Sequence, residues 1–303
     1  MVTFLQQLVN GLTVGAIYAL IALGYTMVYG VLGLINFAHG EVFMVGTYVG
    51  IYAALALGYE AMRPEAFGPH QALVVMLAAM AGAAMLGLTI ERLAYRPVRG
   101  APRLTALITA IGVSLLLQNL GMLVFGADPE SFPRIVVERV YDVGGVVVTN
   151  VKLLIVAIAI VLVVALELLV HRTWTGKAMR ALSFNMGAAR LMGIAVDRVI
   201  AQTFAIGSAL AAAGGILFGL DQSKCDPQMG VLVGLKAFVA AVVGGIGNIR
   251  GAALGGLLIG VAEQMTAGYL SADYRDAITF VLLIGVLLLR PAGLLGTVRQ
   301  EKV

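Results

Sequence analysis

Charged side chains are scarce in this chain, and their scarcity decides its broad class. Only 12% of the 303 residues are Asp, Glu, Lys or Arg, whereas 60% are hydrophobic, and the mean hydropathy is +0.98. A soluble domain averages about 25% charged and about 45–50% apolar residues. The composition therefore excludes an ordinary soluble domain and indicates an integral membrane protein.

Cysteine, histidine and phosphate-binding sequences are also scarce. The single cysteine, Cys225, rules out an internal disulfide, and three histidines offer too few ligands for a zinc site. A G-x-x-x-x-G-K-[ST] phosphate cradle does not occur, since Gly176-Lys177 is followed by Ala178. We therefore expect no catalytic residues, no metal and no cofactor. Energy for any active process must come from another subunit or from an ion gradient.

Long apolar runs, in contrast, fill most of the sequence. A bilayer core of about 30 Å needs roughly 20 apolar residues for each helical span. The runs cover residues 8–29, 41–58, 71–90, 104–125, 152–170, 199–220, 232–246, 251–267 and 276–293. We predict an all-α polytopic membrane protein in one transmembrane domain over residues 1–303. It has eight or nine segments, some broken at Gly-rich stretches, and a possible internal pseudo-repeat.

The distribution of positive charge predicts how these segments are oriented. Arginine and lysine concentrate in residues 91–103 and 171–198, which the positive-inside rule places in the cytoplasm. The loops 126–150, 221–227 and 271–276 are acidic or balanced and are expected outside. With nine segments the N-terminus lies outside and the C-terminus in the cytoplasm. We therefore interpret the net charge of +4 as a sign of how the chain is oriented in a lipid bilayer, and not as a sign of affinity for nucleic acid.

A Gly-punctuated polar interruption separates the first two apolar segments. Residues 30–41 read GVLGLINFAHGE, between runs without any charged residue. A charge near the middle of a bilayer costs roughly 2.5–3.5 kcal/mol, and a broken backbone is tolerated only inside protein or beside water. Asn36, His39 and Glu41 are therefore candidates for lining a translocation path. Two alternatives stay open: Glu41 caps the following helix, and His39 is a buried, hydrogen-bonded ring without a ligand.

A second interruption is similar to the first. Residues 242–251 (VVGGIGNIRG) match residues 31–40 (VLGLINFAHG) at four of ten positions. Gly-interrupted segments at corresponding places in two halves of a chain point to the substrate path of a transporter. Gly244 and Gly247 therefore join the path candidates. Shared membrane composition, without any duplication, is the alternative explanation.

Two ionisable residues lie within the later apolar segments. Lys236 opens the seventh segment, and Glu263 lies late in the eighth. Charges inside a membrane usually pair with each other or mark an ion or substrate path. We interpret Glu263 as a candidate path residue. The ammonium of Lys236 either lines the path or extends to the outer interface along its aliphatic stem.

The inner loop, residues 171–198, has the pattern of an amphipathic helix. We expect interruptions at Gly176 and Gly187, with Arg180 and Arg190 beside an apolar stripe. The stripe consists of Leu182, Met186, Ala189 and Met192 or Gly193. A short amphipathic helix between two spans suits docking into a groove of a partner protein. An interfacial helix lying on anionic lipid is the alternative.

Several stretches of the sequence that contain polar residues resemble, in the same order, the branched-chain amino acid ABC permease family, of the LivH type. They lie at residues 15–20, 29–41, 91–99, 110–119, 234–238 and 244–247. In the inner loop, Ala188-Ala189-x-x-x-Gly193 is similar to the EAA-x-x-x-G coupling motif of ABC-importer permeases, with Gly187 at the usual Glu position. The resemblance implies that Arg180, Ala188, Ala189, Arg190 and Gly193 couple transport to an ATPase.

The resemblance also implies a multi-pass, non-catalytic permease domain of the bacterial inner membrane. Its expected partners are a second homologous permease, two ATP-binding cassette ATPases and an extracytoplasmic substrate-binding protein. Branched-chain amino acids are the favoured cargo, and urea or short amides are the alternative. A rival hypothesis from the residues alone is an ion-coupled secondary transporter that acts by itself, with Glu41, His39 or Glu263 as a proton relay.

Overall fold

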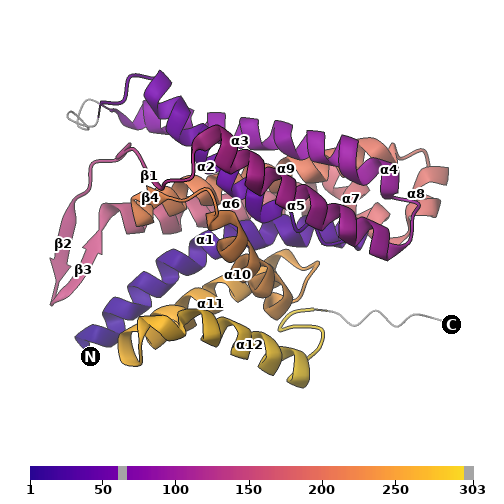
Figure 1. Ribbon diagram of the computed structural model, residues 1–303. Helices are drawn as coiled ribbons and strands as arrows, with labels where there is room; N and C mark the ends of the chain where they lie inside the picture. Colours follow the sequence, from indigo (N-terminus) through magenta and orange to yellow (C-terminus); the bar gives the residue numbers. More distant parts are fainter. Residues whose placement is uncertain (61–66, 297–303) are drawn as a thin grey trace.

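The protein is described by a computed structural model over residues 1–60 and 67–296. Long helices dominate it, with two small two-stranded sheets toward the end where the chain begins (Figure 1). The long helices are α1 (Val2–Leu32), α2 (His39–Ala56), α3 (Pro69–Ile90), α5 (Arg103–Phe125), α6 (Asn150–Arg172), α9 (Val196–Gln222), α10 (Met229–Gly244), α11 (Ile249–Tyr269) and α12 (Arg275–Leu289).

Short elements connect these helices. The short helical elements are a π-helical turn (Glu91–Tyr95), α4 (Arg96–Val98), α7 (Trp174–Phe184), α8 (Met186–Leu191) and a 3₁₀ turn (Ala272–Tyr274). The strands are β1 (Glu130–Ser131), β2 (Val140–Val143), β3 (Val146–Thr149) and β4 (Lys224–Cys225), paired antiparallel as β1 with β4 and β2 with β3.

Each apolar run of the sequence coincides with one long helix, so the predicted all-α polytopic membrane architecture is confirmed. Five helical stretches of the described chain are long and apolar enough to cross a membrane: α1, α3 with its extension to Val98, α5, α6 and α9. The C-terminal helices are shorter or more polar; α10 has 16 residues and α12 has 15. They adjoin the second interruption of the chain.

Helix α1 is the centre of the bundle. It passes between α10, α11 and α12 on one side and α2, α3 and α9 on the other (Figure 1). Glycines permit backbone contact with α11: a β-carbon on Gly15 would lie 2.7 Å from Leu257 Cα, and one on Gly11 would lie 2.6 Å from Val261 Cα. Facing them, Gly256 and Gly260 of α11 are equally close to α1. This spacing of small residues is typical of tightly packed membrane helices.

The end of the molecule where the chain begins carries a β-hairpin. Gly144 and Gly145 join β2 to β3 and both have positive φ, 64° and 85°, as a tight two-residue hairpin requires. The Gln6 side chain of α1 donates to Val147 O (3.0 Å) and accepts from Val147 N (2.8 Å). The hairpin is therefore fastened to the first turns of α1.

At the opposite end, the inner loop breaks at other residues than predicted. The interruptions expected at Gly176 and Gly187 are wrong, because both glycines lie inside helices, α7 and α8. The helices begin instead after Thr173 and Asn185, whose side chains accept hydrogen bonds from Gly176 N (3.1 Å) and Ala188 N (2.9 Å). Threonine and asparagine are favoured at such helix starts because they satisfy a free backbone N–H.

The contact between α1 and α11 predicts a test. Replacing Gly260 with alanine places a methyl group against the Gly15 backbone, and overpacking of this kind costs about 1–3 kcal/mol. We expect Gly260→Ala to lower the midpoint of thermal unfolding in detergent. Gly285→Ala in α12 is the matched control, since an added β-carbon there meets nothing within 4 Å. Equal midpoints for both variants would contradict the close packing.

Candidate functional site

The first interruption lies between α1 and α2, and Asn36 holds it in place. Helix α1 ends at Gly33, in the left-handed conformation, and α2 begins at His39. The buried Asn36 Oδ1 accepts hydrogen bonds from the Tyr95 hydroxyl (2.9 Å) and from Ala38 N (3.1 Å). Asn36 thus ties the broken backbone to the π-helical turn. Its contact with a transported molecule stays a prediction.

His39 is the first residue of α2 and is buried against α1. Its ring meets Tyr25 edge-on, with the ring centroids 4.7 Å apart. A β-carbon on Gly24 would overlap the imidazole, so glycine at that position makes room for it. The Nε2 atom has no hydrogen-bond partner in the described structure. The histidine is therefore packed between α1 and α2, and its contact with a transported molecule stays a prediction.

Glu41, in the first turn of α2, borders a cavity of about 240 Å³. Its side chain is 1% exposed; Oε1 accepts a long hydrogen bond from Ser114 Oγ (3.4 Å), and Oε2 has no hydrogen-bond partner in the described structure. Tyr25, Gln118 and Gly230 also border the cavity. The apolar walls are Phe37, Ile111, Leu115, Val231, Leu235 and Phe238. A buried carboxylate thus faces a mostly apolar pocket between α1, α2, α5 and α10, and because Leu115, Val231 and Leu235 on its walls are 38–54% exposed, the pocket opens at the surface of the chain.

The second interruption, between α10 and α11, lies beside the first. Gly245 and Gly247 have φ of 109° and 93°, which only glycine adopts without strain. A β-carbon on Gly30 would lie 3.6 Å from Gly247 Cα. Gly244, in contrast, is packed against the backbone of Gly251. The sequence therefore identified two interruptions that the fold brings together, although Gly244 and Gly247 do not border the Glu41 cavity.

Backbone groups released at the second interruption are paired by the segment after α12. Leu294 N donates to Val243 O (2.8 Å), and Leu295 N donates to Gly244 O (2.9 Å). Asn248, which caps α11, donates from its side chain to Leu295 O (2.8 Å). Because a membrane offers no water to such groups, this pairing is what permits the break.

A smaller cavity of about 80 Å³ joins the two interruptions to the inner loop. Gly30 and Gly247 border it together with Met179 and Arg180 of α7. Val170, at the end of α6, completes one wall. The inner loop therefore contacts the broken region of the bundle directly. Sequence reasoning could not anticipate this contact, because it joins segments about 150 and 70 residues apart.

Glu263 and Lys236 belong to a separate buried charge cluster. Lys236 Nζ lies 3.0 Å from Glu263 Oε1 and 2.6 Å from Asp276 Oδ1, and because Asp276 is half-exposed, the extension of Lys236 toward the interface stays a prediction. Glu263 also accepts hydrogen bonds from Tyr18 (3.0 Å) and Thr279 (2.7 Å). The cluster links α1, α10, α11 and α12. It does not border the Glu41 cavity, so Glu263 as a path residue stays a prediction.

The apolar surface of the inner loop overlaps the predicted stripe at Met192 but differs from it elsewhere. Leu182 and Ala189 are buried within the protein, at 2% and 4% exposure, so they are not free to dock. Phe184, Leu191 and Met192 are instead 82–90% exposed. We call these three residues the exposed apolar surface of the inner loop. Phe184 ends α7, Leu191 ends α8 and Met192 follows it. The periodicity of one continuous helix did not predict this surface, because the three residues belong to two helices.

The coupling candidates surround this surface. Arg180 and Arg190 are exposed, as is Ala188, whereas Ala189 is turned inward. Gly193 follows α8 with φ of 81° and has open space around it, so glycine is needed there for backbone conformation and not for packing. Ile194 N then donates to Ala189 O (3.1 Å), which closes the turn. The motif-like spacing thus corresponds to one helical turn and its left-handed end.

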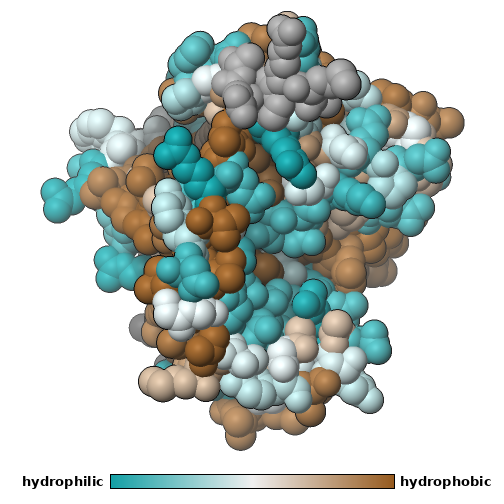
Figure 2. Space-filling model, turned by 90° about the vertical axis from the view of Figure 1, so that its left-hand side faces the viewer, coloured by the Kyte–Doolittle hydropathy of each residue, from teal (hydrophilic) through white to brown (hydrophobic). Residues whose placement is uncertain are grey.

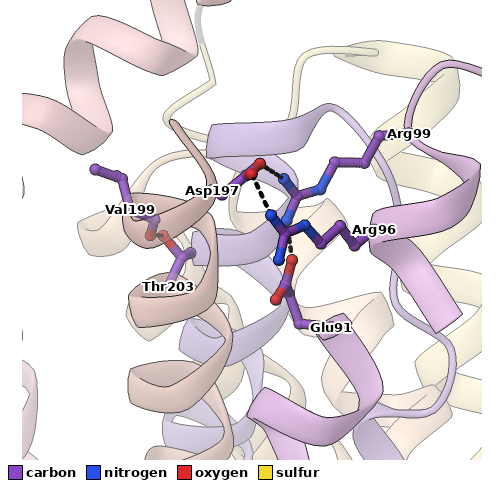
Figure 3. Close-up of polar contacts among 6 residues, drawn as sticks. All are labelled: Glu91, Arg96, Arg99, Asp197, Val199 and Thr203. Atoms are coloured by element: carbon purple, nitrogen blue, oxygen red, sulfur yellow. Dashed lines mark hydrogen bonds and ion pairs between the residues drawn. The ribbon is translucent and has the colours of Figure 1, made fainter. Parts of the chain in front are cut away.

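An ionic network fixes the end of the inner loop to the π-helical turn (Figure 3). Asp197, at the start of α9, lies 2.6 Å from both Arg96 and Arg99. Arg99 also pairs with Glu91, which is buried. The network escaped prediction because these residues attracted notice only through family resemblance. It holds the segment that follows Gly193 against the helix that carries Tyr95, the hydrogen-bond partner of Asn36.

Together these features define a polytopic membrane protein with two adjoining broken segments and an inner loop that contacts them. Residues 7–287 match the family described as "Branched-chain amino acid transport system / permease component", and the chain belongs to that family. It is 45% identical to the high-affinity branched-chain amino acid transport system permease protein BraD of Pseudomonas aeruginosa, over 99% of this chain and 98% of that protein. It is 44% identical to LivH of Escherichia coli K12, with the same coverage.

The buried charge cluster predicts a large effect on stability. Lys236→Met leaves Glu263 buried without its cation, and breaking one partner of a buried pair costs roughly 3–5 kcal/mol. We expect a lower midpoint in thermal unfolding of the purified chain. The double variant Lys236→Met/Glu263→Gln should recover part of the loss. Lys224→Met, at an exposed lysine, is the control, and a similar midpoint for it and Lys236→Met would refute the pairing.

Proposed function

We propose that this chain is the permease subunit of an ABC importer that moves branched-chain amino acids into the cell. The observation that carries the proposal is its 44–45% identity, over nearly the full length, to permease proteins of high-affinity branched-chain amino acid transport systems. ATP is hydrolysed on two separate ATPase subunits, and the chain itself is not catalytic. A second, homologous permease and an extracytoplasmic binding protein complete the transporter.

The proposed direction of transport follows from the arrangement of the two ends. The inner loop, with α7 and α8, lies at one end of the bundle and the β2–β3 hairpin at the other (Figure 1). Hydrophilic residues are prominent at the hairpin end (Figure 2), as suits a surface in contact with water. The positive-inside rule places the inner loop and the C-terminus in the cytoplasm. The N-terminus and the hairpin then face outward, where the binding protein delivers its cargo.

The ATPase docks on the exposed apolar surface of the inner loop. Phe184, Leu191 and Met192 are large apolar side chains that water does not favour, and Arg180 and Arg190 flank them. A groove on a partner buries such side chains and pairs the arginines at its rim. Movement of α7 then reaches Gly30 and Gly247 through the smaller cavity. In this way closure of the ATPases rearranges the two interruptions.

Uptake by the reconstituted transporter tests the cargo and the energy source. We expect proteoliposomes that contain both permeases and both ATPases to accumulate leucine, isoleucine and valine only with ATP and the binding protein present. Urea and acetamide should not compete. Uptake by this chain alone, driven by a proton gradient, would overturn the proposal in favour of a secondary transporter. Accumulation of urea and not of leucine would show that the cargo is urea and not branched-chain amino acids.

Docking predicts the effect of one surface substitution. Phe184 is 88% exposed, so Phe184→Ser removes apolar contact area without disturbing the packing of the chain itself. We expect the yield of ATPase that copurifies with the tagged chain to fall about tenfold, the loss typical of a central interface residue. Val140→Ser, at an exposed position in the hairpin at the opposite end, should leave the yield unchanged. Equal yields for the two variants would show that Phe184 is not part of the interface with the ATPase.

A further inference from the structure

Among the described residues, no lysine, arginine or histidine forms an ion pair with the carboxylate of Glu41. It is 1% exposed, and its Oε2 atom has no hydrogen-bond partner in the described structure. Ser114 supplies one contact, at 3.4 Å, which is long for a hydrogen bond to a carboxylate. Lys236, on the neighbouring α10, is engaged by Glu263 and Asp276. A carboxylate buried without a cation is costly, and a cation that enters the cavity offsets that cost.

The cavity beside Glu41 has the size and the walls of a small-molecule site. Its volume is about 240 Å³, which corresponds to several water molecules at about 30 Å³ each. Phe37, Leu115, Leu235 and Phe238 provide apolar surface, and the described lining contains no lysine, arginine or histidine. Ligand sites are typically apolar with a few convergent polar groups. A ligand that fits has one cationic group and an aliphatic body.

Glycine keeps the part of the cavity next to the carboxylate open. A β-carbon on Gly230 would lie 2.7 Å from Glu41 Oε2 and 2.6 Å from Gly40 O, so any side chain there would fill the space. Gly230 also belongs to the first turn of α10, so the positive end of that helix dipole lies beside the Glu41 carboxylate itself. Gln118 adds an amide to the same lining. The cavity therefore offers a carboxylate to a cationic group and the Gln118 amide to a second polar group of a ligand.

We infer that Glu41 binds the α-ammonium group of an amino acid in this cavity, with the aliphatic side chain against the apolar walls. This inference rests on the proposed function and deepens it. It gives the permease a selectivity of its own, in addition to that of the binding protein. It also separates the roles of the intramembrane acids: Glu41 contacts the substrate, whereas Glu263 holds helices together.

Equilibrium binding tests the inference directly. The assembled transporter, purified in detergent without the binding protein, is incubated with radiolabelled leucine at up to millimolar concentration. We expect saturable binding. It should be displaced by 3-methylbutylamine, which keeps the cation, and far less by 4-methylpentanoate, which lacks it. Glu41→Gln should weaken leucine binding about tenfold or more, as expected for loss of a charged hydrogen bond, and Glu41→Asp should keep part of the affinity.

Two controls keep the test decisive. Glu138→Gln removes a carboxylate from an exposed position and should bind leucine like the unmodified transporter. Val231→Trp fills the cavity without changing charge and should abolish binding, which decides the question if Glu41→Gln fails to assemble. Unchanged binding in Glu41→Gln, or equal displacement by the two analogues, would overturn the inference. Absence of binding while ATP-driven leucine uptake persists would overturn it too, yet leave the proposed function standing.

Discussion

A helix broken inside a membrane releases backbone groups that lipid cannot satisfy, and the pairing of those groups governs this structure. At the first interruption Asn36 supplies the pairing, and at the second the residues after α12 do so through Val243 and Gly244. Each of these pairings brings a segment that is distant in the sequence to the centre of the bundle. At the first interruption this segment is the π-helical turn, through Tyr95, and at the second it is the C-terminal segment. The compact centre of the bundle is therefore a consequence of its interruptions.

The same pairing connects the inner loop to the interior of the bundle. Asn36 is bonded to Tyr95, and the next residues along the chain, Arg96 and Arg99, hold the start of α9 through Asp197. On the other side α7 contacts Gly30 and Gly247. The inner loop is thus attached to the first interruption by two routes that do not share residues.

The lengths of the apolar segments and the positions of their polar interruptions could be predicted from the sequence, because both depend on neighbours along the chain. Each of the nine runs became a helix, and residues 30–41 and 242–251 became the two breaks. Partners across the bundle were not visible. Lys236 meets Glu263 and Asp276 through folding of α10 against α11 and α12, and no local pattern encodes that contact. The inner loop was misjudged for a related reason: Thr173 and Asn185 start helices by capping, which outweighs the glycines nearby.

The candidate site shows the same limit. The sequence singled out Asn36, His39 and Glu41 together, yet the fold gives them different surroundings: Asn36 is hydrogen-bonded, His39 is packed beneath Gly24, and Glu41 borders a cavity. The walls of that cavity come from α5 and α10, far away in the chain. A polar residue in a membrane segment is therefore a reliable sign that something is unusual, but its role depends on tertiary contacts.

The glycine contacts between α1 and α11 have a consequence for biosynthesis. Helix α1 packs its glycine face against α11, which is synthesised much later, and Tyr18 and Glu263 bond across 245 residues. Until α11 is inserted, that face of α1 is open to lipid or to other proteins of the membrane. Contacts so distant in sequence form late in folding. A chain whose synthesis has not reached α11 therefore leaves the backbone at Gly11 and Gly15 without its closest neighbour.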